Sequence, residues 1–310
     1  MMPNGENALI RRTTIWGTAI LFFSLGTASS AAPALDADAI GRAAGVAATA
    51  TPDGVVRIGW SRSEVAVTVD GARLDPAAGL GSWAAFQTAR GGAMMMGDTV
   101  LFEDEISPAL DAALAAGLEV TAIHNHFVFD TPHVLFMHIG GHGDAAALAG
   151  SVKQVWDAVR GVRAKSAAPA AGFGGAAPAP GTLDAAALAA AIGSKPTVQG
   201  AVIKFTIGRE VQMHGVASGA AMGVNTWAAF SGSDARASVD GDFAMTAGEV
   251  QFVLRALRSA GIHVVALHNH MMGENPQLFF LHYWGKGPAL ELARGVRGAL
   301  DAQATGSPHR

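Results

Sequence analysis

The sequence predicts an α+β fold of two tandem homologous modules that form an intramolecular pseudo-dimer. Each module is expected to be a mainly antiparallel sheet packed by helices, in the order β-β-β-α-β-β-α after an opening helix. Three observations support this: a long internal repeat, the same succession of strand and helix patterns in both copies, and a linker-like segment between them.

The repeat is anchored by "SWAAF" at residues 82–86 and "TWAAF" at 226–230, which sets an offset of 144 residues. The offset holds without a gap from position 82 to Gly143, opposite Gly287, and 22 of these 62 positions are identical. Chance does not produce this agreement, so the chain is a tandem duplication.

The segment between the copies, residues 163–182, reads "RAKSAAPAAGFGGAAPAPGT". An Ala/Pro/Gly stretch has little apolar surface to bury and is typical of a linker. We therefore expect modules over residues 35–162 and 183–305.

The pattern within each module indicates the elements in order. An Ala-rich helix (35–45 and 183–193) precedes two alternating strands (55–60 and 65–71; 201–208 and 210–216). A third strand (93–102 in the first copy) leads into a helix over 104–116, which ends at Gly117. A hairpin with its turn near 129–132 and an amphipathic helix from 145 complete the module.

Residues 1–31 have the pattern of a secretory signal peptide. Arg11 and Arg12 precede the apolar run "IWGTAILFFSLG", and the small residues of "TASSAAPA" follow as a cleavage zone. The residues after the arginine pair match a twin-arginine signal poorly, which favours the general secretory route. We expect a periplasmic or secreted protein.

The composition limits the classes of partner that the protein is expected to bind. The chain has a net charge of −4, with 15% charged and 50% hydrophobic residues, so it lacks the basic footprint of a nucleic-acid-binding protein. It has no cysteine and hence no thiolate ligand, no disulfide and no site for an N-terminal lipid anchor. A small molecule or a metal ion is the expected partner, with no stable membrane anchor after signal cleavage.

Histidines recur at fixed positions of the hairpin. The stretch "AIHNHFVFDTPHVLFMH" (122–138) is matched by "ALHNHMMGENPQLFFLH" (266–282). Because strand side chains alternate between faces, two histidines at i and i+2 share a face, and a third across the hairpin joins them. The predicted ligands for zinc or another divalent metal are His124, His126, His138, His268, His270 and His282.

Two other interpretations of the histidines remain open: a structural hydrogen-bond network, and catalysis without a metal. By strand parity, Val120, Ala122 and Val128 would share the histidine face, and Asn125 would be buried on the opposite face. Asn269 would be buried in the same way in the second copy.

Two glutamates are the candidate catalytic residues or fourth metal ligands. Glu249 follows Thr246 at the spacing of a capping box, whereas Glu105 is kept where Phe102 replaces that threonine. The capping role is the stronger interpretation, and persistence without the capping partner supports the alternative, a functional role as a general base. Asp98 and Asp242 each follow a glycine and are interpreted as turn residues.

Tryptophans and phenylalanines of the "WAAF" segments are expected to anchor the core beside a cleft, with ligand stacking as the alternative. These four residues are Trp83, Phe86, Trp227 and Phe230.

The segments 67–86 and 94–144, together with their second-copy counterparts, resemble the LppY/LpqO family, a bacterial exported family classed as a domain of unknown function. The resemblance covers both modules, and its "HNH…P…H" core is specific. It implies an exported location and a duplicated architecture, and it implies no particular reaction. The lipoprotein anchoring of the family's namesakes is not carried over, because this chain lacks the lipobox cysteine.

The leading hypothesis is therefore an exported protein that binds a divalent metal or small ligand through a histidine-rich hairpin in each module. The alternatives are a metal-dependent hydrolase-like enzyme, with Glu105 or Glu249 as base on a metal-bound water, and a non-catalytic structural envelope protein.

Overall fold

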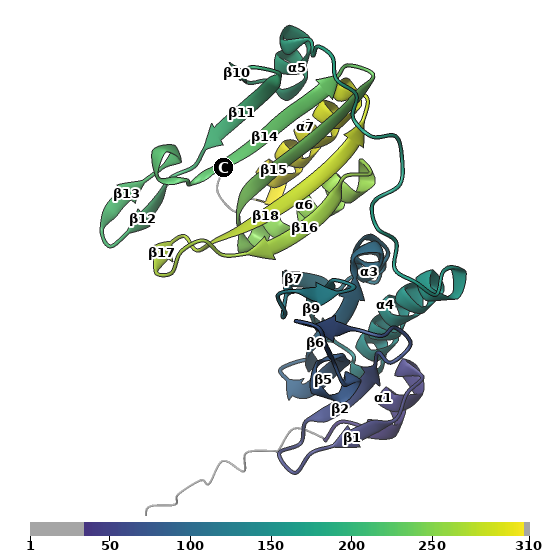
Figure 1. Cartoon of the computed structure of the whole chain (residues 1–310). Coiled ribbons are helices and arrows are strands. Elements are labelled where there is room, and N and C mark those ends of the chain that lie inside the picture. Colours follow the sequence, from purple (N-terminus) through teal and green to yellow (C-terminus); the bar gives the residue numbers. More distant parts are fainter. Residues whose placement is uncertain (1–33, 307–310) are drawn as a thin grey trace, which may run out of the picture. The chain divides into compact units, whose positions relative to one another are not determined.

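The computed structural model describes residues 34–306 (Figure 1), so the predicted signal peptide lies outside the described residues. Both modules contain helices and antiparallel strands in the same order, which confirms the predicted fold class. Within residues 34–306, no helix is long and apolar enough to cross a membrane.

The elements of the first module are α1 (Ala37–Ala44), β1 (Ala48–Ala50), β2 (Val56–Ser61), β3 (Thr68–Val69), β4 (Ala72–Arg73), α2 (Pro76–Gly79), β5 (Gly81–Ala89), β6 (Gly92–Phe102), the 3₁₀ turn η1 (Glu103–Glu105), α3 (Ile106–Ala115), β7 (Glu119–Asn125), β8 (Asp130–Thr131), β9 (Val134–Gly143) and α4 (Ala145–Lys165).

Those of the second module are α5 (Ala185–Ile192), β10 (Thr197–Gln199), β11 (Val202–Gly208), β12 (Val211–Met213), β13 (Val216–Ser218), η2 (Ala220–Met222), β14 (Asn225–Ser233), β15 (Arg236–Thr246), α6 (Ala247–Ser259), β16 (His263–His268), β17 (Glu274–Asn275), β18 (Leu278–Gly287) and α7 (Ala289–Gly306).

One antiparallel sheet runs through both modules in the order β1-β2-β5-β6-β9-β7-β16-β18-β15-β14-β11-β10. The order is the same when read from either end, if each strand is replaced by its counterpart in the other module. At the centre, Ile123 of β7 pairs with Leu267 of β16, and these two residues are counterparts at the offset of 144. Pairing of a residue with its own counterpart is the mark of a two-fold interface, so the predicted pseudo-dimer is confirmed.

Side chains add to this central pairing. The Gln251 amide donates to Val120 O at 2.8 Å and accepts from Val120 N at 3.1 Å. The Arg258 guanidinium holds both carboxylate oxygens of Asp111 at 2.8 and 2.9 Å. Backbone and charged contacts therefore join the modules at the same edge.

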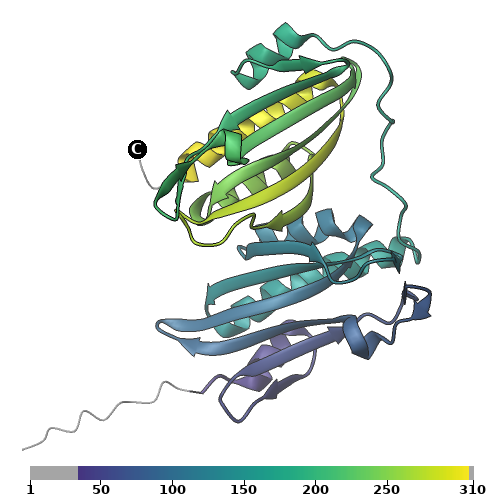
Figure 2. The ribbon, with the colours of Figure 1, turned by 60° about the vertical axis from the view of Figure 1, so that its left-hand side comes forward.

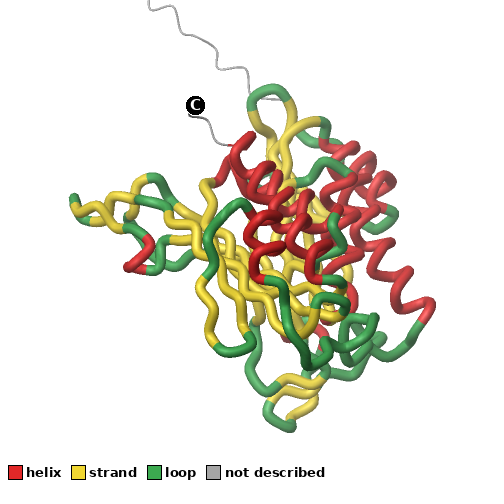
Figure 3. The backbone as a smooth tube through the Cα atoms, turned by 90° about the horizontal axis from the view of Figure 1, so that it is seen from above, coloured by secondary structure: helices red, strands yellow, loops and turns green. Residues whose placement is uncertain are grey.

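The long helices lie on one side of the sheet (Figures 2 and 3). Leu101, Met137 and Ile139 point into the core beneath them and are fully or almost fully buried. We call the opposite side of the sheet the open face. Two small three-stranded sheets, β4-β3-β8 and β13-β12-β17, fold over part of it.

Two elements differ from the prediction. The tryptophan segment 81–89, for which the sequence predicts no strand, is the long strand β5, because its alternate residues Ala84 and Phe86 face the core. The alternating run 65–71 contributes only the short β3, because Val67 and Val69 pack in the small open-face core and not in the main one.

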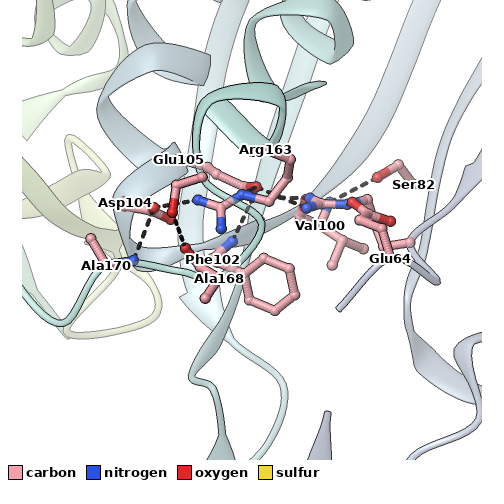
Figure 4. Close-up of polar contacts among 11 residues, drawn as sticks. Glu64, Ser82, Val100, Phe102, Asp104, Glu105, Arg163, Ala168 and Ala170 are labelled. Atoms are coloured by element: carbon pink, nitrogen blue, oxygen red, sulfur yellow. Dashed lines mark hydrogen bonds and ion pairs between the residues drawn. The ribbon is translucent and has the colours of Figure 1, made fainter. Parts of the chain in front are cut away.

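A buried ion pair at the start of α3 links this helix to the sheet of the first module (Figure 4). Glu105 accepts two hydrogen bonds from Arg62, at 2.8 and 2.9 Å, and one from Phe102 N at 2.8 Å. Arg163, seen in Figure 4 between Asp104 and Glu105, lies 2.7 Å from the Glu105 carboxylate.

The second module repeats this arrangement with different partners. Glu249 is held by Arg209, by Gln303 at 3.0 Å and by Thr246 N at 2.9 Å. Burial desolvates the Glu249 carboxylate and raises its pKa, but these hydrogen bonds outweigh that effect, so the pKa lies below its ordinary value.

We therefore expect Glu249→Gln to lower the free energy of unfolding at pH 7 by about 3 kcal/mol, since it leaves Arg209 without its buried partner. Because the folded-state pKa is depressed, the stabilisation from Glu249 is present above the unfolded pKa of about 4.3 and is lost as the pH falls through the folded value. The variant should show a shallower loss of stability below pH 5 in urea titrations.

Glu291→Gln is the matched control, because Glu291 is exposed in the first turn of α7. It should change the stability by no more than about 0.5 kcal/mol. Equal effects of the two substitutions would contradict the assigned role of Glu249.

Candidate metal centre

The histidines project from the open face at the end of β7 and β16. Each strand carries a β-bulge, between Val120 and Ala122 in β7 and between Val264 and Ala266 in β16. The extra residue shifts the alternation, so Val120 faces the helix-side core together with Ile123, and His124 faces the other side. The prediction that Val120 shares the histidine face was wrong for this reason.

The hairpin brings the third histidine to the first, as the strand parity predicts. His138 pairs with Ala122 in the β7–β9 register and is therefore diagonal to His124. Its Nε2 lies 2.9 Å from Nε2 of His124. The strand that carries His138 continues beyond it to Gly143.

The same three positions come together in the second module. His268, His270 and His282 each offer a ring nitrogen, and these nitrogens lie within 4.8 Å of one another. Ring centroids are 5.1 Å apart for His268 and His270, and 5.0 Å apart for His268 and His282, which are the separations of the first module as well. Among the described residues, this is the group of three that could hold a metal ion.

An aromatic ring forms the floor under one histidine of each cluster. His126 stacks on Phe136 with 3.3 Å between centroids, and His270 stacks on Phe280 with 3.4 Å. Each phenylalanine stands two residues before the third histidine on its strand, so it shares that histidine's face. Stacking fixes the orientation of an imidazole that lies beyond the last residue of the strand.

A carboxylate completes each cluster. Asp98 is directly opposite His138 in the β6–β9 pairing, and Asp242 is opposite His282 in the β15–β18 pairing. Both aspartates are buried, and in each the Oδ1 atom has no hydrogen-bond partner. Asp242 Oδ2 lies 3.6 Å from Nε2 of His270.

The interpretation of these aspartates as turn residues was wrong, because both lie inside long strands. Two sequence signals could have found them: they are identical in the two copies, and each is a charged residue within an apolar strand that precedes the hairpin. We call His124, His126, His138 and Asp98 the first cluster, and His268, His270, His282 and Asp242 the second cluster.

Burial governs the electrostatics of both clusters. It raises the pKa of Asp98 and of Asp242, although the three neighbouring histidines counteract this in each case. It lowers the pKa of His126 and of His270 despite the nearby aspartate. A lowered histidine pKa favours the neutral imidazole, which is the form that binds a metal.

The candidate bases lie elsewhere. The described partners of Glu105 and Glu249 are arginines, a glutamine and backbone N–H groups at the start of α3 and α6, and none of them is a histidine of either cluster. Glu105 persists without a capping threonine because it still accepts the Phe102 N–H and the Arg62 guanidinium.

Asn125 and Asn269 are exposed and not buried as predicted. Each donates to the backbone carbonyl two residues later, Phe127 O at 2.8 Å and Met271 O at 3.1 Å, and so supports the loop that carries the second histidine of each cluster. The "HNH" spacing thus combines two cluster residues with one loop-forming residue.

The tryptophans of the repeat flank the clusters on the open face, whereas Phe86 and Phe230 are buried in the core, as expected for anchors. Trp83 pairs with Asp98, and Trp227 pairs with Asp242, in the adjacent strands. Arg57 lies 4.8 Å over the Trp83 ring and Lys204 lies 4.2 Å over Trp227. Each cluster therefore has a half-buried indole one strand away from its aspartate, and a cation on the strand beyond the indole.

No curated protein matches the chain in sequence. Two solved structures resemble it weakly: a trimeric bacterial microcompartment shell protein, PduB, and EtuB from Clostridium kluyveri. Each is 12% identical to this chain, and each match covers 83% of this chain. The matches cover 90% of the PduB chain, with a TM-score of 0.20, and 91% of the EtuB chain, with a TM-score of 0.22.

A family model matches each module separately, over residues 38–158 and 186–302. Both matches contain the complete histidine–aspartate cluster of their module. The chain therefore belongs to the family described as Domain of Unknown Function (DUF1259), of which it carries two copies.

Proposed function

We propose that the protein binds a divalent metal ion, zinc or a similar ion, through the second cluster. His268, His270 and His282 would supply three imidazole nitrogens, and the Asp242 carboxylate would be the fourth ligand or would orient a bound water. The convergence of three ring nitrogens within 4.8 Å carries the proposal.

The distances suit such an ion. Zinc–nitrogen bonds of about 2.0–2.1 Å in a tetrahedral site place two ligand atoms roughly 3.3 Å apart. The 3.6 Å between Asp242 and His270 is close to that separation. The unpartnered Oδ1 of Asp242 is a buried acceptor, and a cation would satisfy it.

The first cluster has the same residue types, but a hydrogen bond between His124 and His138 closes it. One ring nitrogen donates and the other accepts, so the pair satisfies itself without an ion. This observation favours a second candidate function for the first cluster: a structural network that fixes the β7–β9 hairpin.

A hydrolase-like reaction would require a base beside the bound ion. Asp242 meets that requirement better than Glu249, because its carboxylate adjoins His270 and His282 whereas Glu249 is bound to Arg209. We propose metal binding as the function, in a periplasmic or secreted setting shared with LppY/LpqO-type proteins.

Removal of ligands tests the metal centre. Untagged wild-type chain, stripped with a chelator and then dialysed against zinc, should retain about one ion per chain. Zinc at 100 times its Kd should add about 2.7 kcal/mol to the free energy of unfolding. His268→Ala and His282→Ala should lose both effects in metal analysis and thermal melts.

His142→Ala is the matched control, because it removes an exposed imidazole that lies outside both clusters. It should retain the ion, and His124→Ala should retain it as well. Wild-type protein that holds no stoichiometric metal and melts at the same temperature with zinc would refute the proposal.

The role of the aspartate gives a separate prediction. Asp242→Asn removes the carboxylate charge with little change in shape, and we expect it to weaken zinc binding by about 10–100-fold. A competition titration against a zinc chelator measures the zinc affinity. Asp240→Asn, two residues earlier on the same strand, is the comparison variant. An Asp242→Asn affinity equal to wild type would show that the carboxylate takes no part.

A further inference from the structure

A cavity of about 500 Å³ opens in the second module between the end of α5, the end of β11 and the last turns of α7. Its walls include Ile207, Arg209, Leu300 and Ala304. It contains no residue of the second cluster, so it is a separate feature of the module.

The duplication identifies the residues at the same place in the first module. Ile207 pairs with Thr226 on the neighbouring strand, and Trp60 pairs with Ser82, which is the counterpart of Thr226. Trp60 is therefore the counterpart of Ile207. Along the last helix the offset of 144 matches Leu300 with Trp156 and Ala304 with Arg160.

The first module fills this space with its own side chains. The Trp60 and Trp156 rings pack with centroids 5.9 Å apart. Arg62 lies 4.9 Å from the centre of the Trp60 ring, and Arg160 lies 4.4 Å from it. An indole held by two guanidinium groups thus occupies the position of the cavity.

The second module has the counterpart of Arg62, which is Arg209, but it has no tryptophan at the positions of Trp60 and Trp156. Arg209 binds Glu249 as Arg62 binds Glu105, and both also donate to a β-strand carbonyl, Ala244 O for Arg209. The Arg62 side chain is fully buried, whereas 24% of the Arg209 side chain is exposed. The guanidinium that an indole covers in one module is therefore open to the cavity in the other.

We propose that this cavity is a binding site for the planar aromatic ring of a small ligand, of indole size, that stacks against Arg209. Ile207 and Leu300 supply apolar walls of the kind that a ring requires, and Arg209 supplies the cation. The charged groups of the lining are paired, Arg209 with Glu249 and Arg297 with Asp301, which favours an uncharged ligand.

The test uses 5-fluoroindole as the probe with the full chain, followed by fluorine NMR. The wild type should broaden and shift the probe signal in a saturable way, with a Kd on the order of 1 mM or lower. The double variant Ile207→Trp/Leu300→Trp rebuilds the packing of the first module, and it should weaken binding at least tenfold. Absence of saturable binding by the wild type would overturn the proposal.

Ala304→Arg serves as a second variant, because it adds the counterpart of Arg160 at a half-buried position on the last turns of α7 and does not alter the core. It should also weaken binding at least tenfold with an unchanged circular dichroism spectrum. Leu290→Trp, an exposed position at the start of the same helix, is the control and should bind as the wild type does. Folded Ala304→Arg that binds like wild type, or an equal loss in Leu290→Trp, would refute the site.

Discussion

One extra residue in β7 and in β16 decides which side chains each central strand presents to its two faces. Thr121 and Val265 occupy the bulges, and after them the alternation of the strand is reversed. Val120 and Ile123 can therefore both enter the helix-side core, while His124 reaches the open face. The central pairing of Ile123 with Leu267 and the assembly of both histidine clusters depend on this local irregularity.

The sequence was sufficient for the features that depend on the repeat and on local periodicity. The duplication predicts two alike modules that form a pseudo-dimer, and the period of two predicts that His138 lies beside His124 across the hairpin. The sequence was insufficient for features that depend on contacts between segments far apart in the chain. Nothing in the local pattern marks the bulge, and Asp98 looks like a turn residue until β9 is placed beside β6. The persistence of Glu105 without a capping threonine suggests a catalytic role, and its arginine partner, Arg62, lies 43 residues away in the sequence, where no local pattern reveals it.

The two copies show which features a duplicated module can vary. Both keep a cluster of three histidines and an aspartate, and both keep a glutamate–arginine pair beneath the first long helix. They differ in what surrounds these groups. Two histidines of the first cluster bond to each other, whereas those of the second cluster have no such bond in the described chain, and Trp60 and Trp156 fill a space that Ile207 and Leu300 leave open. Both binding sites that we propose therefore lie in the second module.

The most direct measurement is anomalous diffraction at the zinc absorption edge, from crystals of the full chain grown with zinc. The account predicts an anomalous peak bounded by His268, His270 and His282, with the Asp242 carboxylate facing it and metal–nitrogen distances of about 2.0–2.1 Å. Peaks confined to exposed histidines such as His142, with an intact but metal-free second cluster, would contradict it.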